Sequence, residues 1–169
     1  MPTDIVSKKL ILNAEVAHRK LRRMAFQIAE NNAGETELII AGIDGNGIIL
    51  AKNLVKELEQ IVSFPIQLMT ISLNKKKPLE VTLDNDQDYN DKNIIVVDDV
   101  ANTGKTMLYA IKPFLDFLPK KIQTLVLVER SHKLFSIQPD YVGLSVASTL
   151  QENIIVETDG QQVTGAWLH

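Results

Sequence analysis

The feature that most constrains this chain is the stretch IIVVDDVANTGKT at positions 94–106. Its first four residues are apolar and β-branched, which is typical of a strand buried on both faces of a parallel sheet. Asp98 and Asp99 come next, at the carboxyl end of this strand, where open α/β sheets bind their ligands. The polar turn that follows offers backbone N–H groups and hydroxyls before a helical pattern, an arrangement that attracts a phosphate.

The chemistry of this stretch favours a sugar phosphate over a nucleotide. Two carboxylates would repel a polyphosphate, but they accept hydrogen bonds from sugar hydroxyls, and a divalent metal can screen further phosphates. A P-loop would require glycine at position 99, where this chain has Asp99. The remaining structural alternative is a capped helix that follows a strand with a chance acidic pair.

The stretch resembles the phosphoribosyl-pyrophosphate (PRPP) signature of type I phosphoribosyltransferases. The resemblance implies that Asp98 and Asp99 are catalytic residues that hold the ribose hydroxyls, with Mg²⁺ bound beside them. It also implies a PRPP-binding turn that surrounds the 5-phosphate. The residues of this turn are Val100, Ala101, Asn102, Thr103, Gly104, Lys105 and Thr106.

Length and composition indicate one globular domain over residues 1–169. The chain has no cysteine, which excludes disulfides and thiolate metal sites. No apolar stretch approaches the roughly 20 residues of a membrane span, and no signal-peptide pattern is seen, so we expect a cytoplasmic protein without a membrane partner. The net charge of −3 provides no overall attraction to nucleic acid.

Hydrophobic periodicity predicts alternating strands and helices, hence a doubly wound, mostly parallel α/β sheet with helices on both faces. This is also the fold that the resemblance implies. The predicted helices cover 13–31, 47–61 and 103–118. The predicted strands cover 38–43, 65–73, 94–99 and 122–128, with shorter ones at 141–144 and 154–157.

The glycine-rich turn after the first of these strands contains Asp44, Gly45, Asn46 and Gly47. By the resemblance, this turn binds the pyrophosphate of PRPP. Relatives commonly place lysine or arginine here, whereas this chain has Asp44 and no cation, which opposes pyrophosphate binding. The alternative is a tight turn with no ligand.

Residues 73–92 are polar and rich in helix breakers, with room for a short strand at 79–83. The resemblance implies that this segment is a small, flexible hood that excludes water from the active site. Lys75, Lys76 and Lys77 are candidates to supply positive charge to the departing pyrophosphate. They are equally typical of a solvated charge run.

The strand end near Arg130 narrows the resemblance to the bifunctional pyrimidine-operon attenuator proteins that are also uracil phosphoribosyltransferases. This likeness spans nearly the whole chain, although Glu129 and Ser131 depart from that group's pattern. It implies a base-binding pocket, whose residues are Arg130, His132, Val146 and Ala147. A histidine at a strand end is otherwise commonly structural or exposed.

We therefore expect an enzyme that transfers ribose 5-phosphate from PRPP to a nucleobase and releases pyrophosphate in nucleotide salvage. The attenuator likeness suggests uracil and pyrimidine metabolism, but hypoxanthine and guanine enzymes share the signature and the pattern at 139–143. The family also implies a homodimer.

Two alternative functions remain open. The first is RNA binding, because Arg19, Arg22 and Arg23 share one face of the predicted first helix. That face is also what an ordinary solvated helix presents, and Phe26 stands where the attenuator relatives have histidine. The second alternative is a catalytically weak sensor of PRPP or nucleotides, which the acidic Asp44 and the short hood favour.

Overall fold

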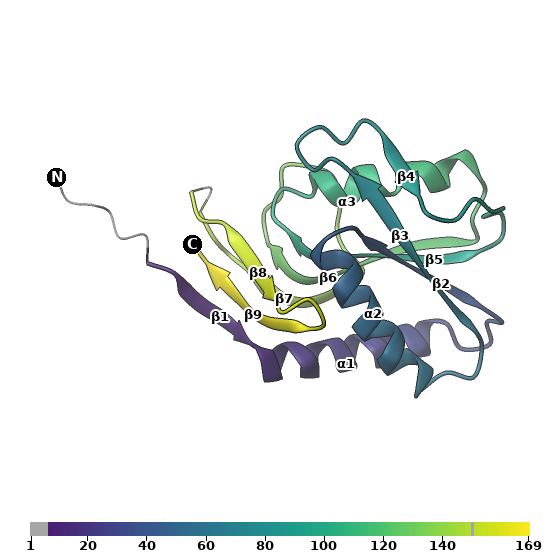
Figure 1. Ribbon diagram of the computed structural model, residues 1–169, viewed down its shortest axis with the longest axis horizontal. Coiled ribbons are helices and arrows are strands. Elements are labelled where there is room, and N and C mark those ends of the chain that lie inside the picture. Colours follow the sequence, from purple (N-terminus) through teal and green to yellow (C-terminus); the bar gives the residue numbers. More distant parts are fainter. Residues whose placement is uncertain (1–6, 150) are drawn as a thin grey trace.

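The computed structural model describes residues 7–149 and 151–169, and its larger sheet has six strands (Figure 1). The strand order is β4-β3-β2-β5-β6-β7, and all neighbours are parallel except β4, which runs antiparallel to β3. The strands are β2 (Leu38–Ile43), β3 (Ile66–Leu73), β4 (Val81–Leu83), β5 (Asn93–Ala101), β6 (Lys121–Arg130) and β7 (Tyr141–Val146).

The centre of this sheet is the stretch that the sequence singled out. Residues 94–97 of β5 are fully buried, as expected for a strand covered on both faces. β5 pairs with β6 on one side and with the distant β2 on the other, where Gly42 lies opposite Val97. The chain order of the parallel strands reverses at this β2–β5 pair. In open α/β sheets the ligand crevice lies beyond the carboxyl ends of the strands at such a reversal.

Helices cover both faces of the sheet, which confirms the predicted doubly wound fold. On one face lie α1 (Ala14–Asn31) and α2 (Asn46–Glu59), packed against alternate β5 side chains such as Ile95 and Val97. On the other face lie α3 (Lys105–Ala110) and the 3₁₀ helix η1 (Lys112–Asp116), which share a second core with Val96.

The last predicted helix is shorter than expected. The sequence predicts one helix over 103–118, but α3 ends at Ala110 and η1 continues as a 3₁₀ helix. Pro113 lies in η1, and proline in a helix interior removes a hydrogen-bond donor and clashes with the preceding turn. Beyond the break, Leu115 and Leu118 are exposed.

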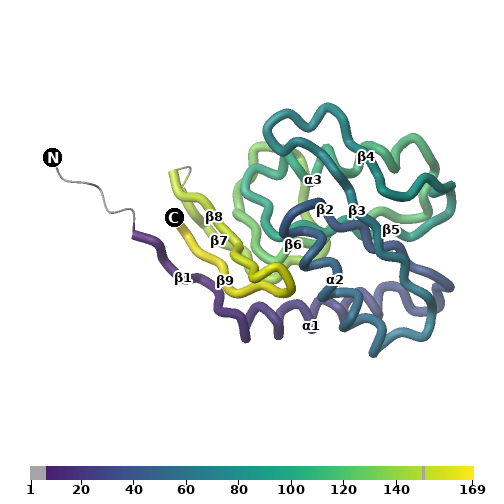
Figure 2. The backbone as a smooth tube through the Cα atoms, viewed as in Figure 1, coloured from purple at the N-terminus to yellow at the C-terminus, as the bar shows by residue number. Residues whose placement is uncertain are grey.

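A second, antiparallel sheet joins the two ends of the chain. Its order is β1-β9-β8, with β1 (Lys9–Asn13), β8 (Ile154–Thr158) and β9 (Val163–Leu168). The sequence predicts a strand at 154–157 but misses β1 and β9. In Figure 2 the purple start of the chain runs beside its yellow end, and this sheet stands next to β6 and β7.

The two halves of the expected hood, residues 73–92, have different surroundings. Tyr89 is buried, and its ring packs edge-on against Phe114 and Phe117 at centroid distances of 5.1 and 5.3 Å. The second half is therefore anchored in the core. The first half forms the loop over 74–80 and the short strand β4, whose Val81 and Leu83 also pack against the second core, so the loop over 74–80 is the part left to act as a hood.

Candidate active site

The acidic pair lies within the last residues of β5, which continues two residues beyond it. Asp98 and Asp99 are both buried. Oδ1 of Asp98 accepts a hydrogen bond from the Asp99 N–H, and Oδ1 of Asp99 accepts one from the Val100 N–H, each at 2.9 Å. A backbone N–H group thus fixes one oxygen of each carboxylate, and the second oxygen is available to other partners.

The surroundings of Asp98 oppose its negative charge. Burial raises the pKa of the Asp98 carboxyl well above its usual range, and the charge of Asp99 raises it further. Lys75 partly offsets this rise, because its Nζ lies 3.8 Å from Oδ1 of Asp98. A buried acid with so few partners is suited to accept hydrogen bonds from the hydroxyls of a ligand.

The turn after β5 lines a cavity of about 140 Å³ together with Asp98 and Lys75. Gly104 has φ +85°, and a Cβ at this position would lie 2.7 Å from Cγ2 of Ile137. Only glycine therefore fits this conformation of the turn. Within the turn, the Lys105 N–H donates to Oγ1 of Thr103 at 3.2 Å. The Thr103 carbonyl accepts hydrogen bonds from the N–H groups of Leu134 and Phe135, so the loop after β6 supports the turn from outside.

Asn102 connects this turn to the second sheet. Its Nδ2 donates to the Ile154 carbonyl at 3.1 Å, and its Oδ1 accepts from the Ile154 N–H at 3.2 Å. The side chain is therefore engaged with β8. What Asn102 can offer to a phosphate is its backbone.

The glycine-rich turn after β2 lies beside the acidic pair, as expected. A Cβ at Gly47 would lie 2.9 Å from the Val97 carbonyl and 3.0 Å from Oδ1 of Asp98, so glycine allows the start of α2 to pack directly behind the acid. Asn46 donates to Oδ2 of Asp99 at 3.1 Å and to the Val156 carbonyl at 2.9 Å. Both strand-end turns are thus tied to β8.

Asp44 is exposed in the same turn and adds negative charge there. Its Oδ1 accepts a hydrogen bond from the N–H of Gly45 at 2.9 Å, so this oxygen is directed back at its own turn. The turn lies at one side of a wide hollow of about 740 Å³ that Asn74, Lys77 and other hood residues also line.

The predicted base-binding residues are only partly brought together. Arg130 is buried and lies opposite Val146 in the β6–β7 pairing. Its guanidinium donates to the carbonyls of Thr149 and Glu152, which fixes the loop that follows β7. His132 and Ala147 are exposed beyond these strand ends.

A buried ion pair next to this region is not predicted by the sequence. Nζ of Lys133 lies 2.7 Å from Oε2 of Glu129, and their side chains are 4% and 7% exposed. The lysine stem also lies 3.4 Å from the position that a Cβ of Gly104 would take. Lys133 is in a loop without periodicity, so no local pattern indicates that it folds inward.

Asp98 and Asp99 are the residues that would hold a magnesium ion. Among residues 7–149 and 151–169, no group of three or more His, Asp or Glu side chains gathers as a complete metal site. Mg²⁺ is commonly held by one or two carboxylates together with substrate phosphates and water. Asp98 and Asp99 supply such a pair.

Within the same described part of the chain, no helix is long and apolar enough to cross a membrane.

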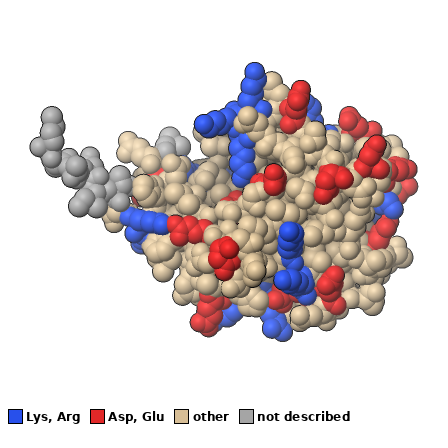
Figure 3. All heavy atoms as spheres, in the orientation of Figure 1, with Lys and Arg blue, Asp and Glu red and all other residues tan. Residues whose placement is uncertain are grey.

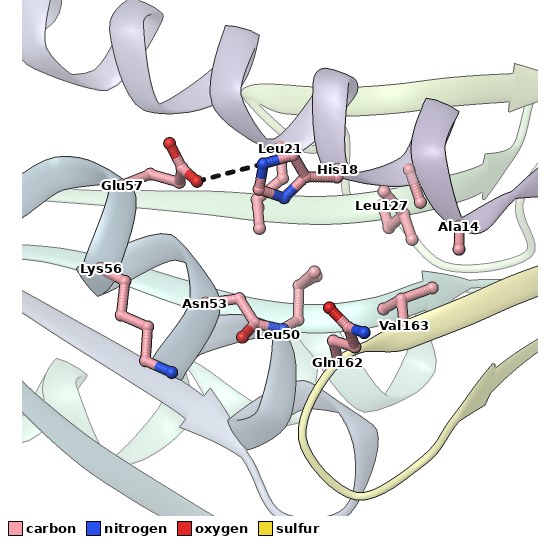
Figure 4. Close-up of a pocket in the computed structure, with 11 residues that line it drawn as sticks. Ala14, His18, Leu21, Leu50, Asn53, Lys56, Glu57, Leu127, Gln162 and Val163 are labelled. Atoms are coloured by element: carbon pink, nitrogen blue, oxygen red, sulfur yellow. Dashed lines mark ion pairs between the residues drawn. The ribbon is translucent and has the colours of Figure 1, made fainter.

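A separate hollow of about 210 Å³ lies between α1 and α2, on the face of the sheet that these helices cover. Figure 4 shows His18 and Glu57 reaching toward each other across it, with Gln162 and Val163 closing one end. Nε2 of His18 lies 3.5 Å from Oε1 of Glu57. None of the site residues that the sequence predicts lines this hollow.

Comparisons with known proteins show which proteins this chain resembles. The protein-family model described as phosphoribosyl transferase domain matches residues 8–160 of this chain. The bifunctional protein PyrR of Bacillus pumilus is 35% identical over 162 residues, which covers 89% of this chain and 90% of that protein. PyrR of Bacillus subtilis is 34% identical, with 90% and 91% covered. These relatives confirm the likeness to the bifunctional attenuator group.

Solved structures with the same fold include two purine-base enzymes. A hypoxanthine phosphoribosyltransferase of Trypanosoma cruzi superposes with a TM-score of 0.77 at 16% identity and covers 95% of each chain. A hypoxanthine-guanine phosphoribosyltransferase of Bacillus anthracis superposes with a TM-score of 0.71 at 21% identity, covering 87% of this chain and 85% of its own.

Proposed function

Since this chain belongs to the phosphoribosyl transferase domain family, we propose that it transfers the 5-phosphoribosyl group of PRPP to a nucleobase and releases pyrophosphate. The observation that carries this proposal is the meeting of three features at the β2–β5 reversal. They are the buried acids Asp98 and Asp99, the glycine-shaped turn after them, and the glycine-rich turn after β2.

In the proposed reaction, the ribose hydroxyls donate to the carboxylates of Asp98 and Asp99, and the 5-phosphate lies in the turn around Gly104. Contacts at both ends of the sugar orient its anomeric carbon. A base nitrogen attacks this carbon and loses its N–H proton to solvent, while the bond to pyrophosphate breaks and the bonding electrons leave with the pyrophosphate oxygen. Bound Mg²⁺ would neutralise charge on that leaving group. The loop over 74–80 would exclude water.

The direct test is to incubate the protein with PRPP, Mg²⁺ and, separately, uracil, hypoxanthine, guanine and other bases, and to measure pyrophosphate release. We expect release with at least one base, with uracil first because of the attenuator likeness. PRPP binding without release for any base would instead support the sensor function.

A variant of the acidic pair tests the assignment of the site in the same assay. Converting Asp98 and Asp99 together to Asn should lower kcat/KM by roughly 100-fold or more, because both hydroxyl acceptors lose their charge. An Asp86→Asn variant, which changes an exposed hood carboxylate, should behave as wild type. Equal activity of the two variants would contradict the assignment of the site.

RNA binding is the second candidate function, and exposed side chains on α1 favour it. The guanidinium of Arg22 lies 6.0 Å from the centroid of the exposed Phe26 ring, a pair that suits stacking with bases. Arg23 is less available, because it donates to the carbonyls of Val142 and Gly143. A gel shift with pyrimidine-leader RNA should weaken with salt and on Arg22→Ala. Absence of a shift at low ionic strength would exclude this function.

We also propose that the protein forms a homodimer through the face of α3 and η1. Leu108, Leu115 and Leu118 are exposed there, with 38%, 66% and 82% of their surface accessible. Light scattering after gel filtration should give twice the chain mass, and Leu115→Glu with Leu118→Glu should return it to the monomer mass. A monomer in wild type would contradict this proposal.

A further inference from the structure

The chain contains three residue pairs whose chemistry allows spontaneous succinimide formation. They are Asp44-Gly45, Asn46-Gly47 and Asp159-Gly160. In such a pair, the backbone nitrogen of the second residue attacks the side-chain carbonyl carbon of the first. Glycine favours the attack because it has no Cβ to obstruct it and its backbone is the most adaptable. Two of the three pairs lie in the turn after β2.

Asp44 and the nitrogen of Gly45 are already in contact. Oδ1 of Asp44 lies 2.9 Å from the Gly45 nitrogen. Because Oδ1 is bonded directly to Cγ, a small rotation about the Cα–Cβ bond brings this carbon against the nitrogen. A Cβ at Gly45 would meet no atom within 4 Å, so there is room beside the nitrogen for a ring.

The pair Asp159-Gly160 has the same residues in a different geometry. Oδ1 of Asp159 accepts hydrogen bonds from the N–H groups of Gln161 and Gln162, each at 2.9 Å. The carboxylate is therefore directed past the nitrogen of Gly160, which would have to attack it. The bonds from Gln162 and Gln161 also lower the pKa of the Asp159 carboxyl, which favours the unreactive ionised form.

The pair Asn46-Gly47 is held by its contacts. Nδ2 of Asn46 donates to Oδ2 of Asp99 and to the Val156 carbonyl, and its Oδ1 accepts from Oγ1 of Thr158 at 3.1 Å. Asn46 is also the first residue of α2, and a helical backbone turns the following nitrogen away from the side chain. Cyclisation here would require α2 to unwind at its start.

Contact with water does not single out Asp44, because many carboxylates of this protein reach solvent. Acidic side chains are spread over the face of the molecule that Figure 3 shows, and Asp44 and Asp159 are both exposed. What distinguishes Asp44 is the position of the neighbouring nitrogen. Such positioning is a large factor in the rate of an intramolecular reaction.

We propose that Asp44 is a site of spontaneous modification, at which Asp44 and Gly45 cyclise to a succinimide that opens to isoaspartate. The Gly45 nitrogen forms a bond to Cγ of Asp44 and loses its proton, and the hydroxyl of the carboxyl group leaves, so that a molecule of water is released. Water then opens the ring. When it breaks the bond between the nitrogen and the original backbone carbonyl carbon, the main chain continues through Cβ and Cγ.

Isoaspartate lengthens the connection between β2 and α2 by a methylene group, and both ends of this connection are closely packed. A Cβ at Gly42 would lie 2.7 Å from Cα of Ile48, and a Cβ at Gly47 would lie 3.0 Å from Oδ1 of Asp98. A longer turn therefore displaces the start of α2 from behind the acidic pair. The modified protein should be less stable than the original.

The test is a peptide map of the full chain after prolonged warm incubation in mildly acidic buffer. Trypsin places Asp44 in the peptide 24–52 and Asp159 in the peptide 134–169. An isoaspartate form of unchanged mass should accumulate in peptide 24–52 at least about 10-fold faster than in peptide 134–169, because only Asp44 has the nitrogen in place. In the urea-unfolded chain the two peptides should convert at similar rates.

Asp44→Glu is the matched variant, because glutamate would have to close a larger ring, which is slower. Its peptide 24–52 should stay in a single form, and incubation should not change its melting temperature. Incubated wild type should melt at least about 2 °C below fresh protein.

Absence of isoaspartate at Asp44, or equal conversion of both peptides in the folded protein, would overturn the proposal. An increase in the mass of peptide 24–52 would also overturn it, because that increase marks deamidation of Asn46. An unchanged melting temperature of converted wild type would contradict the displacement of α2. None of these measurements requires PRPP, so they are independent of the proposed function.

Discussion

At the scale of one residue, the buried carboxyl of Asp98 in the proposed site opposes folding. The carboxyl is buried beside a second acid, and its nearest cation is the half-exposed Lys75. A group that favours the protonated form in the folded chain destabilises the fold wherever the unfolded chain is ionised. We attribute this arrangement to function, because well-placed charge at a binding site commonly lowers stability.

This account predicts the pH dependence of the variant Asp98→Asn. The folded-state pKa of Asp98 is raised by burial above its unfolded value, so the stability of the wild-type protein falls as pH rises from about 4 through the folded pKa. The variant has no carboxyl at position 98, so its stability does not fall in this way as the pH rises. It should therefore melt at a higher temperature than wild type at pH 7, and the advantage should shrink below pH 4. Thermal melts without ligand from pH 3.5 to 8 measure it, and a lower melting temperature at pH 7 would contradict the account.

The ion pair of Glu129 and Lys133 leads to a second prediction at this scale. Because both side chains are buried, removal of one partner leaves an uncompensated charge. Lys133→Met should lower the free energy of unfolding by about 3–5 kcal/mol, whereas the double variant Glu129→Leu with Lys133→Met should lose much less. Urea denaturation measures both. Equal losses in the single and double variants would show that packing, and not charge, is responsible.

At the scale of elements, β8 holds the two strand-end turns in place. Asn46 bonds to the Val156 carbonyl and to Thr158, and Asn102 bonds to both backbone groups of Ile154. Buried backbone groups of this kind are costly to leave without partners. The second sheet is therefore part of the site, although none of its strands carries a residue that the sequence assigned to it.

We predict that Asn102→Ala lowers stability by about 1–3 kcal/mol, because the Ile154 backbone loses both partners. The same change should raise KM for PRPP more than it lowers kcat, because the turn is displaced while Asp98 and Asp99 remain. Asn102→Asp is the comparison variant. It keeps an acceptor for the Ile154 N–H, but it replaces the donor with a charged oxygen that faces the Ile154 carbonyl, so it should raise KM for PRPP at least as much as Asn102→Ala does. A normal KM for both variants would contradict a role of β8 in shaping the turn.

The sequence predicts those elements whose pattern is local. β2 has the predicted bounds, 38–43, and α1 begins after the predicted cap Asn13, whose Oδ1 accepts from the Val16 N–H at 2.8 Å. The prediction of one helix over 103–118 missed the break at Pro113, although a proline inside a helical pattern indicates such a break. β1 and β9 were missed because each is short and is defined by its partner at the other end of the chain.

The same distinction between local patterns and contacts of distant segments applies to the site. Asp98, Asp99 and Gly104 could be assigned from one continuous stretch. The pairing of Lys75 with Asp98, the inward position of Lys133 and the engagement of Asn46 with β8 all depend on contacts between distant segments. No periodicity or local motif encodes such contacts.

At the scale of the whole molecule, strand order brings the site together. β2 and β5 are separated in sequence by a helix, β3 and β4, yet they are neighbours at the centre of the sheet. Their carboxyl ends therefore present the two turns side by side, and the second sheet packs against both. A ligand that bridges these turns should stabilise the entire fold, because it binds only when all of these parts are assembled.

We predict that PRPP with Mg²⁺ raises the melting temperature, with a stabilisation of about 2.7 kcal/mol at a ligand concentration 100 times Kd. Addition of EDTA should remove most of this effect, because without Mg²⁺ the pyrophosphate charge is not neutralised and is repelled by the acidic pair. EDTA without PRPP should change nothing. A melting temperature that falls on EDTA alone would indicate a structural metal, contrary to this account.

The most direct measurement is a crystal structure of the protein soaked with PRPP and Mg²⁺. We predict the ribose hydroxyls within hydrogen-bonding distance of the carboxylates of Asp98 and Asp99, and the 5-phosphate enclosed by the turn around Gly104. PRPP bound elsewhere on the molecule, or a sugar that touches neither carboxylate, would contradict the central claim.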